Sequence, residues 1–103
     1  MTSTAGRHAR HDLDEVIHAP VRFSIVAALD SVEEAEFAYL RDTIEVSDSV
    51  LSKQAAQLEA AGYVKIRKGR VGKLPRTWLS LTSGGRAAFR RHLDVLRTIS
   101  GEG

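Results

Sequence analysis

Residues 47–66 read SDSVLSKQAAQLEAAGYVKI, and this stretch decides the fold because two structural periods meet inside it. Ser47 is a residue type that caps helices, and Asp48 follows it where the helix dipole favours an acid. Apolar residues then recur at helical spacing, at Leu51, Ala55, Leu58 and Ala61. Gly62 suits the left-handed position that commonly follows a helix. The pattern therefore predicts a capped helix over about 48–61.

After Gly62 the period changes from helical spacing to two. Val64 and Ile66 alternate with basic residues, as expected of a half-buried strand. The breakers that follow predict a loop of about eight residues; they are Gly69, Gly72 and Pro75. Residues 77–81 then form a second strand, which makes an antiparallel hairpin with the first.

Further helices flank this core on both sides. Pro20 suits the first turn of a helix over about 20–31, and a shorter apolar stripe predicts a second helix over about 36–44. Thr82 caps a last, long helix over about 83–99. Helix, short helix, capped helix, hairpin and long helix is the order of a winged helix-turn-helix. We therefore expect an α+β, mostly helical fold with a two-stranded wing and a long C-terminal helix.

The chain of 103 residues fits a single domain of ordinary globular composition. Residues 1–12 lack hydrophobic periodicity and are expected to form a flexible arm, followed by one domain over 13–103. No apolar run approaches the roughly 20 residues that span a bilayer, so a cytoplasmic protein without a membrane partner is expected. The chain has no cysteine, and its four histidines do not cluster with acids. We expect no metal, no cofactor and no enzymatic activity.

Charge is divided unevenly along the chain. Residues 60–93 contain nine Lys or Arg and no Asp or Glu, whereas residues 1–59 contain five basic and eleven acidic residues. A block of a single sign is typical of a surface that binds a polyanion. On a winged helix-turn-helix, that polyanion is double-stranded DNA.

Two groups of residues are expected to contact the DNA. The outward positions of the third helix can reach bases or phosphates in the major groove; they are Ser49, Val50, Ser52, Lys53, Gln54 and Gln57. The hairpin is expected to hold the flanking backbone or minor groove through Arg67, Lys68, Arg70, Lys73 and Arg76. Arg90, farther along, could instead pair with Glu33, Glu34 or Glu36.

The apolar stripe of the last helix is wider than a short domain needs for its own core, which predicts a homodimer. The expected interface residues are Leu13, Val16, Ile17, Phe89, His92, Leu93, Val95, Leu96 and Ile99. A two-fold dimer places two recognition helices about 34–36 Å apart, one turn of DNA.

Three segments carry a family resemblance: VIHAPVRFSIVAAL at 16–29, FAYLRDTIEVSDSVLSKQAAQLEAAGYV at 37–64, and LTSGGRAAF at 81–89. Together they resemble the MarR/ArsR-type winged helix-turn-helix regulators of bacteria, in their short single-domain form. The resemblance covers about residues 13–96. It implies a dimeric DNA-binding regulator of transcription, often a repressor.

Two alternatives remain open from the sequence. A winged-helix interaction module would use the same basic surface to bind an acidic protein. A metal- or redox-responsive regulator would keep the DNA function and add a sensor, although the missing cysteines argue against redox control. The sequence does not identify a small-molecule effector.

Overall fold

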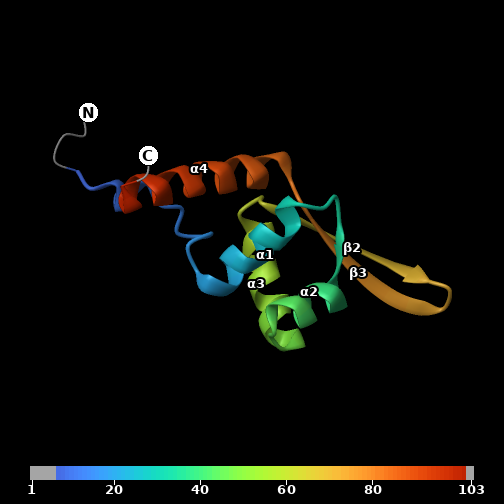
Figure 1. Cartoon of the computed structure of the whole chain (residues 1–103). Coiled ribbons are helices and arrows are strands. Elements are labelled where there is room, and N and C mark those ends of the chain that lie inside the picture. Colours follow the sequence, from blue (N-terminus) through green and yellow to red (C-terminus); the bar gives the residue numbers. More distant parts are fainter. Residues whose placement is uncertain (1–6, 102–103) are drawn as a thin grey trace.

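The computed structural model describes residues 7–101. Its elements follow the expected order, with a short 3-10 helix before them. They are η1 (Ala9–Asp12), α1 (Pro20–Asp30), β1 (Ala35–Glu36), α2 (Phe37–Ile44), α3 (Asp48–Ala60), β2 (Val64–Val71), β3 (Leu74–Leu81) and α4 (Ser83–Ser100). In Figure 1, α1, α2 and α3 form a compact bundle, α4 runs along one side of it, and the β2–β3 hairpin projects away from it. This arrangement confirms the winged helix-turn-helix fold.

The core lies where the three short helices meet the sheet and the first half of α4. Each element contributes apolar side chains that are nearly inaccessible to solvent: Ile25, Val26 and Leu29 from α1, Leu40 from α2, Leu51, Ala55 and Leu58 from α3, Val64 and Leu79 from the sheet, and Ala88 and Phe89 from α4. The positions predicted to face inward on the third helix are thus the buried ones, except Ala61, which is exposed. Burial of a side chain the size of Leu contributes roughly 1.5–3 kcal/mol.

The two predicted helix caps are confirmed. The Ser47 hydroxyl accepts a hydrogen bond from the Val50 N–H at the start of α3, and the Thr82 hydroxyl accepts one from the Gly85 N–H at the start of α4. Gly62 adopts the expected left-handed conformation after α3, with φ of +82°. Local chemistry therefore fixes both boundaries that position the third helix and the long helix.

The hairpin differs from the expected one because its strands are longer. The prediction of an eight-residue loop is wrong: β2 and β3 pair in register up to Val71 and Leu74, which leaves only Gly72 and Lys73 in the turn. Gly72 has a φ of +62°, the sign that a type II′ turn requires at its first central residue. Pro75 is tolerated because β3 pairs only with β2 at that position.

A third strand was not predicted. Between the first two helices, Ala35 and Glu36 form β1 and pair antiparallel with Leu79 and Trp78, which gives the strand order β1-β3-β2. Two residues are too few to show a period in the sequence. The strand matters for the site because it brings acidic residues to the base of the hairpin.

The N-terminal segment also differs from the prediction of a flexible arm over 1–12. Residues 1–6 lie outside the described part of the chain. Ala9–Asp12 form η1, which packs against α4, and Nδ1 of the His8 ring accepts a hydrogen bond from the Arg10 N–H. Order in this segment comes from contacts with a helix some eighty residues away, which local periodicity does not encode.

Candidate nucleic-acid interface

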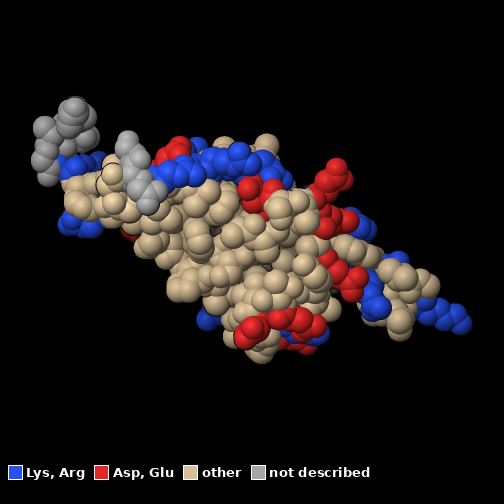
Figure 2. Space-filling model, in the orientation of Figure 1, with Lys and Arg blue, Asp and Glu red and all other residues tan. Residues whose placement is uncertain are grey.

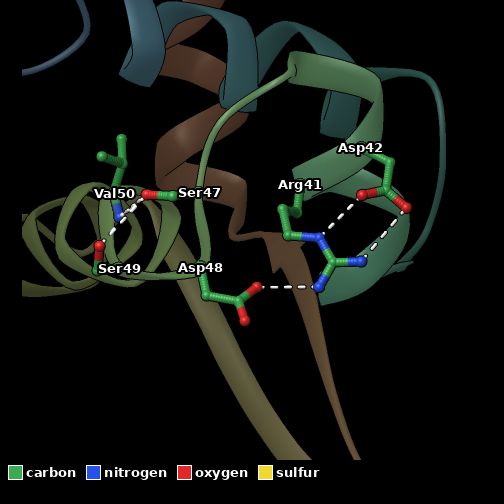
Figure 3. A network of polar contacts seen from close by, with 6 residues as sticks. All are labelled: Arg41, Asp42, Ser47, Asp48, Ser49 and Val50. Atoms are coloured by element: carbon green, nitrogen blue, oxygen red, sulfur yellow. Dashed lines mark hydrogen bonds and ion pairs between the residues drawn. The ribbon is translucent and has the colours of Figure 1, made fainter.

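The turn between α2 and α3 sets the direction of the third helix. Glu45 takes a left-handed conformation, with φ of +64°, and the Val46 N–H then donates to the Arg41 carbonyl at 3.1 Å. Arg41 also donates from Nε to Asp42 at 2.8 Å and from Nη1 to Asp48 at 2.9 Å, so its side chain joins the two helices (Figure 3). The hydrogen bonds to Asp42 and Asp48 raise the pKa of Arg41 above its usual range, so it stays charged.

The predicted contact residues of α3 lie along its outer side. Five of them are exposed and one, Gln54, is half-buried; the exposed ones are Ser49, Val50, Ser52, Lys53 and Gln57. Val50 is an apolar side chain left 39% exposed, which suits contact with a thymine methyl group. The helix therefore presents a mixed surface with a single positive charge, at Lys53.

A residue that sequence reasoning missed joins this surface to α1. Arg22 donates from Nη1 to the side-chain oxygens of both Gln54 and Gln57, each at 2.7 Å. Nothing in the spacing signals this contact, because Arg22 lies some thirty residues upstream and on another helix. Two of the six predicted α3 contact residues thus have their amide oxygens already engaged.

The tip of the hairpin is basic and well exposed. Arg70 closes the turn by donating to the Lys73 carbonyl at 3.2 Å, and both side chains are exposed. Val71 and Leu74, paired across the strands, are 55% and 57% exposed. In Figure 2 basic atoms extend to the far end of the hairpin.

The base of the hairpin is different, because acids neutralise it. Arg67 donates to both carboxylate oxygens of Glu34, at 2.9 and 3.0 Å, and Arg76 lies 3.2 Å from a carboxylate oxygen of Glu36. The hydrogen bonds from Arg67 hold the pKa of Glu34 below its usual value. Arg67 also stacks over the ring of Trp78, 4.1 Å from its centroid. Residues 60–93 contain no acid in the sequence, but in the folded structure acids from residues 34–36 lie beside them.

Four cations of the hairpin are not neutralised by acids in the described structure. Within residues 7–101 they form no ion pair, and all are exposed: Lys65, Lys68, Arg70 and Lys73. A groove of about 420 Å³ separates the hairpin from α3. Its lining combines apolar side chains with one acid and one base: Phe37, Asp48, Ser52, Ala55, Ile66, Lys68, Thr77 and Leu79. Of these four cations, Lys68 is the one that faces α3 across the groove.

The basic residues of α4 are largely paired. Arg86 and Arg90 both reach Asp30 at the end of α1, at 2.8 and 3.4 Å, so the expected partners of Arg90 were wrong although the kind of contact was right. Arg97 pairs with Asp94 on its own helix. In Figure 2 a band of basic side chains runs along α4. Arg86 and Arg90 thus connect α4 to the end of α1.

The structure divides the predicted interface residues into two groups. Ile17, Phe89 and His92 are buried within the single chain, with at most 4% of each residue exposed. The others keep exposed or half-exposed surface: Leu13, Val16, Leu93, Val95, Leu96 and Ile99. Leu96 and Ile99 lie on the second half of α4, where the helix extends beyond the core.

His92 is held inside the domain by a polar network. Its Nδ1 accepts the Asp14 backbone N–H at 3.2 Å, and its Nε2 lies 3.4 Å from Nδ1 of His18. An accepting Nδ1 means a neutral ring with its proton on Nε2. Burial and the neighbouring His18 lower the pKa of His92, and the Asp14 carboxylate opposes that shift only in part.

The lowered pKa of His92 predicts that acid destabilises the fold once the pH falls below about 6.5. The unfolded chain binds this proton near pH 6.5, before the folded chain does, so stability is lost as the pH falls below that value. One proton limits the slope to about 1.4 kcal/mol per pH unit. Urea unfolding at successively lower pH should show a smaller loss for His92→Gln than for the wild type. Equal losses in the two proteins would contradict the prediction.

The described residues provide neither a metal site nor a membrane span. Within residues 7–101, no group of three or more His, Asp or Glu side chains could hold a metal ion. In the same range, no helix is both long and apolar enough to cross a bilayer.

Comparison with known proteins places these features in context. A sequence profile described as "Winged helix DNA-binding domain" matches residues 21–100. An uncharacterized protein of Methanocaldococcus jannaschii is 29% identical over 86 residues, which cover 84% of this chain and 94% of that protein.

Solved structures resemble the whole domain. The transcriptional regulator homologue of Pyrococcus horikoshii OT3 matches with a TM-score of 0.80 and 25% identity, covering 85% of this chain and 87% of that one. The transcriptional regulator BldR of Sulfolobus solfataricus matches with a TM-score of 0.65 and 25% identity, covering 96% and 76%. A MarR-family regulator of Silicibacter pomeroyi shares the fold at a TM-score of 0.66 and 22% identity, covering 90% and 62%.

Proposed function

This chain belongs to the family of winged helix DNA-binding domains, and from that premise we propose that it is a dimeric, sequence-specific regulator of transcription. The observation that carries the proposal is a set of four exposed cations with no ion-pair partner among residues 7–101, on a hairpin that shares a groove with α3. In the proposed complex α3 lies in the major groove, and the hairpin holds the flanking backbone or the minor groove. We place the protein in the cytoplasm and propose that it is a repressor, because a protein bound to its operator keeps other DNA-binding proteins off that site.

The two groups of contacts have different tasks in this proposal. The hairpin cations neutralise phosphates, which supplies affinity without reading sequence. The α3 side chains face base edges and supply specificity, because Gln, Ser and Val offer donors or apolar contact. Arg67 and Arg76 contribute less to affinity than their charge suggests, since Glu34 and Glu36 already balance them.

The double variant Arg70→Ala, Lys73→Ala tests the hairpin contacts. It should lower affinity for all duplexes about equally and flatten the dependence of log K on log salt by up to roughly two units, one for each lost phosphate contact. Fluorescence anisotropy of a labelled random duplex, titrated at several salt concentrations, measures both quantities.

A matched control removes the same charge elsewhere. Arg90→Ala, Arg97→Ala takes two cations from α4, where both are paired with acids. This control should leave the salt slope nearly unchanged. If the two double variants flatten the slope equally, only net charge matters and the hairpin contact is refuted.

The same titration separates the rival function. A winged-helix module that docks an acidic protein has no need to bind DNA near physiological salt. A regulator should bind random duplex there with a Kd of about 10⁻⁴–10⁻⁶ M. Absence of binding by the wild-type chain would favour the interaction module.

A further inference from the structure

Arg22 has an unusual set of partners for a residue on α1. Its Nε–H donates to the carbonyl of Val16, and its Nη1 donates to the side-chain oxygens of Gln54 and Gln57, both at 2.7 Å. A guanidinium Nη carries two hydrogens, so these two bonds use both of them. The side chain is half-buried and held at both ends, which gives it one orientation.

This contact also fixes which way the two amides point. The guanidinium group has donors and no acceptor, so only the oxygen of each amide can face it. The Nε2 groups of Gln54 and Gln57 must therefore turn away from Arg22. The ambiguity of oxygen and nitrogen that ordinarily affects glutamine is removed here by chemistry.

A glutamine held in this way reads bases differently from a free one. A free glutamine recognises adenine by donating to N7 and accepting from N6 with the two ends of its amide. Gln54 and Gln57 have their oxygens directed back toward α1, so they present N–H donors alone. An amide NH2 can donate to both O6 and N7 of guanine, to O4 of thymine or to phosphate oxygens, whereas adenine offers one acceptor, N7, next to the N6 donor group that repels a second donor.

We propose that Arg22 is a positioning residue that sets the base preference of the recognition helix, by turning Gln54 and Gln57 into donor-only readers that favour guanine or thymine over adenine. Arg22 acts through the two glutamines without touching a base itself. The inference rests on the proposed function, because it assumes that α3 faces DNA.

Arg22→Lys is the sharpest test, because it keeps the positive charge but loses the planar guanidinium group with its several N–H donors. A single ammonium group cannot hold the Val16 carbonyl and both amides in the geometry of a planar guanidinium. Duplexes selected from a random pool by the wild-type chain should show guanine or thymine at one or more major-groove positions. In duplexes selected by Arg22→Lys, adenine at those positions should rise, with discrimination falling roughly five- to tenfold.

A second variant covers the case in which Arg22→Lys folds poorly, as judged by its thermal melting. Gln54→Ala, Gln57→Ala keeps Arg22 and removes both amides, and should lose the same base preferences while keeping the salt slope. A purely structural role for Arg22 would lower the melting temperature and leave the selected bases unchanged.

The possible outcomes separate failure of the proposed role of Arg22 from failure of the proposed DNA-binding function. If the wild type selects no duplex at all, the proposed function fails. If it selects a motif that Arg22→Lys or the double glutamine variant also selects with equal discrimination, the role of Arg22 is overturned and DNA binding stands. Loss of discrimination at the same positions in the folded variants supports it.

Discussion

Gly85→Ala is expected to destabilise the fold by about 3 kcal/mol, although alanine ordinarily stabilises a helix relative to glycine by about 1 kcal/mol. A Cβ on Gly85 would lie 2.1 Å from the Tyr63 carbonyl oxygen and 2.9 Å from its carbon. These are backbone atoms, so no rotamer change can relieve the overlap. The clash should outweigh helix propensity and reverse the sign of the substitution.

The Tyr63 carbonyl cannot easily move aside, because the start of α4 is built around it. It accepts the Thr82 N–H at 3.0 Å, while the Thr82 hydroxyl donates to the Gly62 carbonyl at 2.7 Å and accepts the Gly85 N–H at 2.9 Å. Shifting the carbonyl would break the cap of α4. Urea unfolding of the variant and the wild type measures the difference in free energy.

Gly84→Ala provides the matched control one residue earlier. Its Cβ would lie 3.7 Å from the Thr82 hydroxyl oxygen and 3.8 Å from the Gly62 carbonyl oxygen, both ordinary contacts. Stability should stay unchanged or rise by up to about 1 kcal/mol. Equal stability of Gly85→Ala and the wild type would show that α4 does not approach residue 63 this closely.

The elements that could be predicted from the sequence are those with local causes. Ser47 and Thr82 act as caps through hydrogen bonds that span three residues, and the apolar repeat of α3 corresponds to one buried face. Gly62 ends the helix through its own conformation. Each signal lies within a single element or at its boundary, so the fold and the order of its elements could be predicted without knowledge of any long-range contact.

The electrostatics of the site could not be predicted in this way. The ion pairs of Arg67 with Glu34 and of Arg76 with Glu36 join residues that are 33 and 40 positions apart. They form only because β1 pairs with β3, and β1 is too short to be recognised in the sequence. The positive charge expected along the whole hairpin was therefore too high. The charge is concentrated toward the tip, where no acid is within reach in the described structure.

Periodicity also cannot tell the chain's own core from a partner's surface. Phe89 and Leu96 belong to the same apolar stripe, seven residues apart, yet Phe89 is 4% exposed and Leu96 keeps exposed surface. The difference arises because the α1–α3 bundle covers only the first half of α4. Only that geometry shows which residues remain exposed for the proposed dimer.

Ile99→Asp is expected to convert the proposed dimer to a monomer and to lower its affinity for a duplex with two half-sites by about 100-fold. Ile99 is 39% exposed near the end of α4, on the apolar stripe that would meet its equivalent across the two-fold axis. The variant would bring two carboxylates into an apolar interface, where burial of charge is unfavourable. Light scattering after gel filtration measures the mass, and anisotropy on the selected duplex measures the affinity.

Thr98→Asp is the matched control, because it adds the same charge one residue away on a different side of the helix. It should remain dimeric and bind the two-half-site duplex like the wild type. On a duplex with one half-site scrambled, Ile99→Asp and the wild type should bind with similar affinity, since each then engages a single recognition helix. A monomeric wild type or a dimeric Ile99→Asp would refute the interface. Either result would mean that the apolar stripe of α4 covers only the chain's own core.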